Sequence, residues 1–247
     1  MMKEFKKADK LLSTVRRCCQ NYCMIEEGDK IAVGVSGGKD STALLCSLAI
    51  MRRFYPVKYS IIAVNIDLGT GQDTSSVEKL CRETDVEFVK VRTEIGKIVF
   101  ELRREGCSLC SRLRRGALHN EAERLECNKV ALAHTKNDVT ETLLMNLFYS
   151  GNMSVFWPKN TADKRNITLI RPMIYTDEKT VKEFCRVNGI IPAENNCPFS
   201  KATKRETVRK VLQDIERENR GVTDRIFRAI EKRGTDGFKD SGCGEKG

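Results

Sequence analysis

Ser36–Ser41 reads SGGKDS, and this hexapeptide decides the fold class of the 247-residue chain. It lies between a buried-type apolar run, Lys30–Val35, and a segment with helical periodicity that begins at Lys39. Two glycines let the backbone approach an anion closely, and the N–H groups at the start of the next helix point towards that anion. Lys39 adds a cation, while Ser36 and Ser41 add hydroxyl donors. The hexapeptide therefore predicts a phosphate-binding loop between a strand and a helix.

The residues around Gly37 and Gly38 exclude two common nucleotide-binding loops. A Walker A loop needs glycine at position 33 and serine or threonine at position 40, where this chain has Val33 and Asp40. The dinucleotide fingerprint G-x-G-x-x-G is absent as well. Because Asp40 would repel a bare phosphate, we expect it to hold Mg²⁺ or to cap the helix. An ordinary glycine-rich turn is the alternative interpretation of the loop.

Strand and helix patterns alternate outward from this loop. Apolar runs predict strands at Lys30–Val35, Tyr59–Ile66, Val86–Val91, Lys129–Ala133 and Ile167–Arg171. Helical patterns occupy Lys39–Arg53, Thr74–Thr84, a stretch ending at Arg104, Leu109–Leu125, Val139–Tyr149 and Thr180–Val187. This alternation predicts an α/β fold, a Rossmann-like parallel sheet of about five strands with helices on both faces.

The chain divides into four expected parts. A basic helical extension at 1–23 precedes the main α/β domain at 24–199. A basic C-terminal segment at 200–233 is expected to be helical from Lys201 to about Arg233, and 234–247 form a Gly- and Lys-rich disordered tail.

Charge and hydropathy restrict the class of protein. The formal charge is +10, from 44 Lys and Arg against 34 Asp and Glu. Basic residues concentrate in 1–17, 103–115 and 201–233, which favours a nucleic-acid phosphate backbone over a small acidic metabolite. No apolar run is long enough to cross a membrane, and the N-terminus lacks a secretory apolar region. We therefore expect a cytoplasmic protein with no membrane partner.

Eleven cysteines are many for a chain in a reducing compartment, where a disulfide framework is not expected. Cys107 and Cys110 form a C-x-x-C pair, and Cys197 stands alone before a proline. Three thiolates could hold a four-iron cluster with one iron open. The alternatives are an accidental pair or a thioredoxin-like dithiol, and zinc would need a second pair. Further cysteines lie within apolar patterns and are expected in the core: Cys46, Cys81, Cys127 and Cys185.

Asp67 closes the second predicted strand. Ligands of open α/β sheets bind at the carboxyl ends of the strands, so Asp67 is a candidate nucleotide contact. A carboxylate that only stabilises a turn is the alternative.

Longer stretches of the sequence, together with these motifs, resemble a known protein family. SGGKDS is similar to the SGGxDS pyrophosphate loop of the PP-loop ATPases. Four segments resemble the tRNA 2-thiocytidine synthetase family and its 2-thiouridine relatives: Met24–Gly38 (MIEEGDKIAVGVSGG), Cys107–Leu118 (CSLCSRLRRGAL), Thr142–Gly151 (TLLMNLFYSG) and Leu169–Met173 (LIRPM). The matching stretches are spread over roughly residues 20–200.

The resemblance implies an activity. ATP would adenylate the C2 oxygen of a pyrimidine in tRNA, chiefly an anticodon-loop cytidine, and sulfur would then replace that oxygen, releasing AMP and pyrophosphate. ATP, Mg²⁺ and a 4Fe–4S cluster on Cys107, Cys110 and Cys197 are the implied cofactors, with Lys39 and Asp40 in the catalytic site. A cysteine desulfurase or free sulfide would donate the sulfur, and the chain could act as a homodimer.

The resemblance has one departure, at Ala133-His134-Thr135-Lys136-Asn137-Asp138. The family often carries G-H-x-x-D-D there; His134 and Asp138 match as nucleotide-site candidates, while Asn137 replaces an acid. Asp138 also has a structural interpretation, because Glu141 follows three residues later as in a capping box.

Three alternatives for the function stay open. The acceptor could be a tRNA uridine or a small metabolite. A lysidine synthetase would use the same loop but would leave the cysteines unexplained. A cluster- or zinc-containing, redox-sensing RNA-binding module would not be an enzyme.

Overall fold

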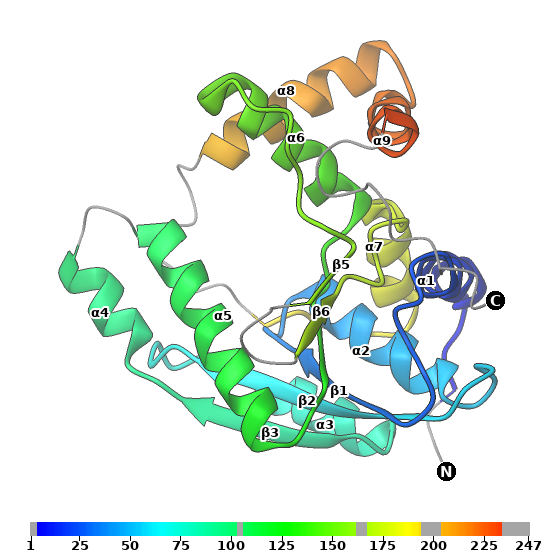
Figure 1. The fold of residues 1–247 in the computed structure, drawn as a ribbon, viewed down its shortest axis with the longest axis vertical. Coiled ribbons are helices and arrows are strands. Elements are labelled where there is room, and N and C mark those ends of the chain that lie inside the picture. The colour runs from blue at the N-terminus through cyan, green and yellow to red at the C-terminus, as the bar shows by residue number, and fades with distance from the viewer. Residues whose placement is uncertain (1–3, 103–105, 162–166, 194–203, 234–247) are drawn as a thin grey trace.

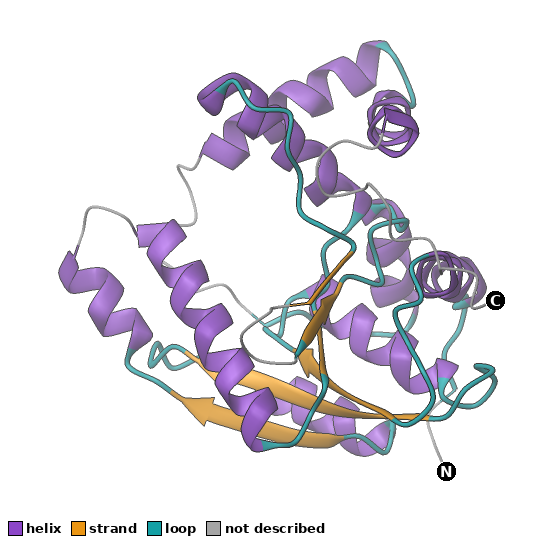
Figure 2. Cartoon of the chain, in the orientation of Figure 1, coloured by secondary structure: helices purple, strands orange, loops and turns teal. Residues whose placement is uncertain are grey.

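The sheet of the computed structural model has the strand order β3-β2-β1-β4-β6-β5, and the structure describes residues 4–102, 106–161, 167–193 and 204–233. The strands are β1 (Asp29–Gly34), β2 (Tyr59–Asp67), β3 (Glu87–Arg92), β4 (Lys129–Ala131), β5 (Lys159–Thr161) and β6 (Thr168–Ile170). Neighbouring strands are parallel except β5, which pairs antiparallel with β6 (Figures 1 and 2). The expected five-stranded parallel sheet is confirmed, with one additional strand.

The additional strand, β5, is not among the strands predicted from the sequence. Its sequence, Lys-Asn-Thr, is polar, and two of its three residues are exposed. Such a segment shows no apolar alternation, because it lies at the sheet edge and pairs only with β6.

Helices cover both faces of the sheet. The larger core contains buried residues of α1 (Asp9–Asn21), α2 (Lys39–Met51), α3 (Ser75–Glu83) and α7 (Glu178–Val187). On the opposite face lie α4 (Ile95–Leu102) and α5 (Gly106–Arg124) (Figure 1). The remaining helices form a group beyond the sheet: α6 (Lys136–Ser150), α8 (Lys204–Glu218) and α9 (Val222–Arg233).

Strand β1 explains why two cores form. Its side chains alternate, so that Ile31 and Val33 enter the larger core while Ala32 enters the smaller one, and all three are fully buried. At the carboxyl end of β1, Gly34 lies against α5: a Cβ there would stand 2.9 Å from Leu118 Cδ2. The absence of a side chain at Gly34 therefore lets α5 pack directly on the end of β1.

The terminal helices attach to the domain in different ways. Leu11 and Val15 of α1 are fully buried in the larger core. The basic segment expected to be one helix from residue 201 to Arg233 is instead two, α8 and α9, which corrects the sequence interpretation. Gly221, with φ +82°, stands between them in the left-handed region that ends a helix.

The four cysteines expected in the core are all buried as free thiols: Cys46, Cys81, Cys127 and Cys185. Among the described residues, no helix combines the length and apolar character needed to cross a bilayer.

Candidate active site

The SGGKDS loop connects β1 to α2 at the carboxyl edge of the sheet. Gly37 has φ +77°, and its carbonyl accepts a hydrogen bond of 2.9 Å from the Ala193 N–H. Gln72 Nε2 donates to the Ser36 carbonyl at 2.7 Å. Gly38 is the N-cap of α2, and no side chain caps the helix there. The first turn of α2 is thus available to an anion, as phosphate binding requires.

Lys39 is held by two carboxylates next to this loop. Its Nζ lies 2.8 Å from Asp40 Oδ2 and 3.1 Å from Glu178 Oε1 on α7. Burial alone would lower the pKa of Lys39, but the hydrogen bonds and charges of Asp40 and Glu178 raise it above its usual value. Lys39 is therefore a cation whose partners an arriving phosphate would have to replace.

Asp40 has the contacts expected of a ligand for a hard cation. Burial, opposed by Lys39, raises the pKa of the carboxyl above its ordinary value, and the charges of Asp138 and Glu178 add to this effect. Its Oδ1 is buried and has no hydrogen-bond partner among the described residues. An unpaired buried carboxylate oxygen is costly unless a ligand satisfies it, so the site fits Mg²⁺.

Asp138 does not cap α6 as the sequence suggested. The N-cap is Thr135, three residues earlier, and Asp138 Oδ2 accepts hydrogen bonds of 2.8 Å from the Thr135 N–H and hydroxyl. The capping box is thus Thr135–Asp138, rather than Asp138–Glu141, because the helix begins at Lys136. The second Asp138 oxygen lies 3.2 Å from Arg205 Nη1 on α8.

His134 precedes this cap and is neutral. Its Nδ1 accepts a hydrogen bond of 3.1 Å from Arg171 Nε, and its ring packs tilted by 33° against Phe156, with centroids 4.6 Å apart. Burial and then the charge of Arg171 lower the pKa of His134 to about 4. Because Nδ1 is an acceptor, the proton of the neutral ring is on Nε2.

Asp67 makes the contacts of a turn residue. Its Oδ1 accepts from the Gly69 N–H at 2.9 Å, and Oδ2 lies 3.4 Å from Lys90 Nζ. It ends β2, beside β1, so it shares the carboxyl edge with the phosphate loop. The turn interpretation accounts for these contacts, and the nucleotide role stays a prediction.

Of the three proposed thiolate ligands, the structure describes the side chain of Cys110. Cys107 and Cys110 occupy the first turns of α5, three residues apart and so on one face of the helix. Cys110 is a half-buried free thiol, whereas the Cys107 side chain and all of Cys197 lie outside the described residues. Within the described part of the chain, no group of three or more Cys, His, Asp or Glu side chains is arranged to hold a metal.

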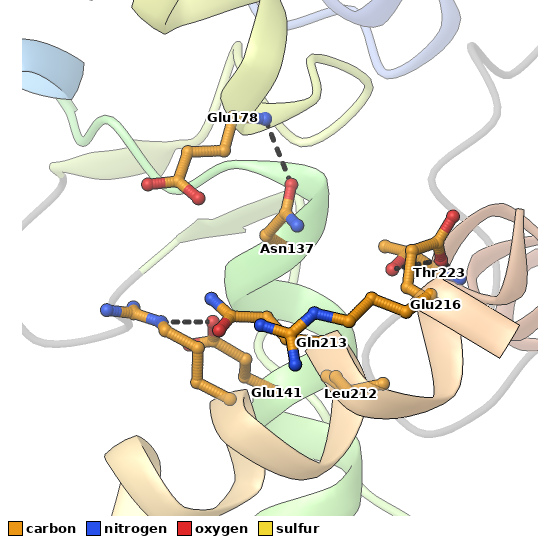
Figure 3. A pocket seen from close by; sticks show the side chains of 9 residues that line it. Asn137, Glu141, Glu178, Leu212, Gln213, Glu216 and Thr223 are labelled. Carbon is orange, nitrogen blue, oxygen red and sulfur yellow. Dashed lines mark hydrogen bonds and ion pairs between the residues drawn. The ribbon is translucent and has the colours of Figure 1, made fainter. Parts of the chain in front are cut away.

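Glu178 was not recognised from the sequence. It borders an open pocket of about 330 Å³ lined by residues of α6, α7, α8 and the start of α9, and its backbone N–H donates to Asn137 Oδ1 there (Figure 3). Glu141 lines the same cavity and binds Arg209 of α8, with 2.9 Å between Oε1 and Nε. The only sequence signal for Glu178 is an acid in the first turn of a helix, 139 positions from Lys39 along the chain.

Comparisons with known proteins place this site in a family. Residues 7–215 match the model of the PP-loop domain. The chain is 38% identical over 227 residues to a tRNA-cytidine(32) 2-sulfurtransferase of Geobacter sulfurreducens, covering 90% of this chain and 88% of that protein. The chain belongs to the tRNA-cytidine(32) 2-sulfurtransferase family of PP-loop proteins. The family member of Syntrophotalea carbinolica is 43% identical over 198 residues, covering 78% of this chain and 75% of that protein.

A solved structure supports the fold of this family member. The U34-tRNA thiolase NcsA from Methanococcus maripaludis, solved with its [4Fe-4S] cluster, superposes with a TM-score of 0.76. The match covers 92% of this chain and 80% of that chain at 21% identity, so it shows a shared fold.

Proposed function

We propose that this protein is an ATP-dependent tRNA thiolase, which replaces the C2 oxygen of an anticodon-loop cytidine by sulfur. The observation that carries the proposal is the coincidence of family membership with the phosphate loop. The chain belongs to the tRNA-cytidine(32) 2-sulfurtransferase family, and its SGGKDS loop presents an uncapped helix start beside an unpaired Asp40 oxygen. These features suit the binding of ATP with Mg²⁺.

In the first step, the C2 oxygen of the base attacks the α-phosphorus of ATP. A bond forms between that oxygen and phosphorus, and the bond from phosphorus to pyrophosphate breaks. Ser36–Ser41 would bind the departing pyrophosphate, and Lys39 would leave Glu178 to neutralise the charge that develops on it. Asp40 would hold the Mg²⁺ ion that accompanies the phosphates.

In the second step, sulfide attacks C2, a C–S bond forms, and AMP departs with the original oxygen and the bonding electrons. Loss of one proton leaves the 2-thio base. Cys107, Cys110 and Cys197 form a donor set suited to a 4Fe–4S cluster, which when bound would offer one iron without a protein ligand to sulfur. A cysteine desulfurase or free sulfide supplies the sulfur in this proposal.

The basic residues of α5 and α8 would bind the tRNA backbone. Arg112, Arg114 and Arg115 are exposed on α5. Lys7 and Lys10, near the N-terminus, instead pair with Glu183 and Asp177 of the α7 region. The positive charge of these two lysines is therefore less available to RNA phosphates. A cytoplasmic location suits both tRNA and reduced thiols, and a homodimer is compatible with this function.

The decisive experiment is nucleoside mass spectrometry of tRNA from cells with and without the gene. We expect 2-thiocytidine to disappear in the deletion strain and to return with the wild-type gene. If the gene carrying Cys46→Ala restores 2-thiocytidine and the gene carrying Cys110→Ser does not, the sulfur chemistry is assigned to the C-x-x-C pair, since Cys46 is a buried core thiol. Loss of a thiouridine in place of 2-thiocytidine would identify a uridine as the target base. AMP formation independent of tRNA in a purified system would refute the proposal.

A further inference from the structure

Four large apolar side chains are exposed on the last turn of α6 and on the segment that leads from it to β5. Phe148, Tyr149, Met153 and Trp157 have 57%, 46%, 56% and 43% of their surface exposed, and we call these four residues the aromatic platform. We propose that the aromatic platform stacks on unpaired bases of an RNA loop. This inference deepens the proposed function, because it names the surface that would receive the loop of the tRNA.

The aromatic platform is built on a fixed segment. Gly151, at φ +61°, turns the chain back after α6. Asn146 then holds the returning segment against the end of the helix. Its side-chain N–H donates to the Ser154 carbonyl at 2.7 Å, and its backbone carbonyl accepts from the Asn152 N–H at 3.1 Å. Rigid placement lowers the entropic cost of stacking, which a freely moving side chain would have to pay on binding.

Trp157 connects the platform to the candidate active site. It precedes β5, which starts at Lys159 opposite Ile170, the last residue of β6, so Trp157 lies at the carboxyl edge of the sheet. Its carbonyl accepts a hydrogen bond from Arg171, whose Nε donates to His134 Nδ1 at 3.1 Å. A base stacked on Trp157 would therefore be next to the edge that carries the phosphate loop.

Cations accompany the aromatic rings. Lys204 Nζ lies 4.8 Å from the centre of the Tyr149 ring. At the Trp157 end, Arg171 donates to the Trp157 carbonyl, and burial followed by the charge of Arg115 on α5 lowers the pKa of Arg171 to about 10. Exposed rings bordered by Lys and Arg suit single-stranded RNA, because the rings stack on bases while the cations bind phosphates.

The intrinsic fluorescence of the protein tests the proposal directly, since Trp157 is its single tryptophan. The probes are a hairpin RNA with a single-stranded loop and a fully paired RNA duplex of the same charge. We expect the hairpin to quench the Trp157 emission at saturation, and the duplex to leave it unchanged. Equal emission with both RNAs, at saturation measured independently by anisotropy, would overturn the proposal.

Variants separate stacking from charge. Phe148→Ala and Trp157→Ala should each weaken hairpin binding about tenfold, without changing its salt dependence, and leave duplex binding intact. Arg115→Ala should weaken both RNAs and lower the salt slope by about one. The matched control is Phe54→Ala, an equally exposed aromatic (49%) at the far end of α2 from the phosphate loop, which should change nothing.

Two further results distinguish this inference from rival explanations. Sedimentation that shows a dimer broken by Phe148→Ala, with hairpin affinity intact, would assign the platform to self-association and refute the RNA role. Hairpin binding is measured without ATP or a sulfur donor, so failure of thiolation would leave the binding result standing. Conversely, Trp157→Ala enzyme with wild-type kcat/KM on tRNA would refute the platform and leave the proposed function intact.

Discussion

The two glycines of the phosphate loop should differ in how much stability the protein loses when each is replaced by alanine. Gly37 has φ +77°, and a Cβ there would stand 2.9 Å from Ala193 Cβ and 3.3 Å from Gln72 Nε2. Gly38 has φ −73°, and its added Cβ would meet only Ser36 Oγ, at 3.4 Å. The structure itself therefore needs glycine at position 37, whereas at position 38 it accepts a side chain.

The magnitudes follow from these geometries. Gly37→Ala costs about 1–2 kcal/mol because alanine is strained in the left-handed backbone conformation. The loop must also shift to avoid the clash with Ala193, so that the total loss of unfolding free energy is roughly 2–3 kcal/mol. For Gly38→Ala, the reduced entropy of the unfolded chain offsets the poorer N-cap, each worth about 0.5–1 kcal/mol, so stability stays near that of the wild type. Both variants should lose ATP affinity by about tenfold or more, since a methyl group at Gly38 occupies the space through which a phosphate approaches the backbone.

Urea unfolding and calorimetric ATP titration of the two variants measure both effects. The unfolding midpoint should fall for Gly37→Ala alone, while the ATP affinity falls by about tenfold or more in both variants. The reasoning is refuted if Gly37→Ala is as stable as Gly38→Ala, or if Gly38→Ala binds ATP as tightly as the wild type.

Three further predictions concern charge and sulfur chemistry. Lys39→Ala should lower tRNA-dependent AMP formation by about 100-fold, the effect of removing one preorganised cation, and a loss below threefold in a rapid-quench assay would contradict its assigned role. Serine at Cys107, Cys110 or Cys197 should abolish iron binding in anaerobically purified protein and leave ATP titration unchanged; stoichiometric zinc in active, air-stable wild-type protein would exclude the cluster. His134 has a folded pKa of about 4, below its unfolded value, so its contribution to stability is complete above about pH 6.5 and is lost as the pH falls towards 4. His134→Gln should flatten the dependence of the urea midpoint on pH over that window, and an unchanged dependence would count against a buried neutral imidazole.

Apolar patterning was sufficient to predict the five parallel strands: β1, β2, β4 and β6 contain buried apolar runs, and the partly exposed β3 alternates apolar and polar residues. The errors occur where local sequence is ambiguous. Gly221 is a recognisable helix terminator, yet the charged sequence on both sides of it suits a single long helix. At α6, Thr135 and Asp138 have the spacing of a capping box just as Asp138 and Glu141 do; the prediction used the second pair, and the helix uses the first.

The candidate site was predictable where it is contiguous in sequence. Ser36–Ser41 carries its own geometry, because a strand, two glycines and a helix start lie next to each other. Glu178 reaches Lys39 only through the packing of α7 against α2, and the contacts among Phe156, His134 and Arg171 bring together three separate segments. Pairings of this kind depend on tertiary structure, so no local pattern indicates them.

Gly34 has a consequence that reaches beyond the end of β1. Its missing side chain sets how closely Leu118, in the middle of α5, can approach the sheet. Cys110 is eight residues away on the same rigid helix, about 12 Å along its axis. Glycine at position 34 therefore lets Leu118 lie directly against the end of β1, two residues before the phosphate loop begins, and so helps to place the thiol-bearing end of α5 relative to that loop, although Gly34 itself takes part in neither chemistry.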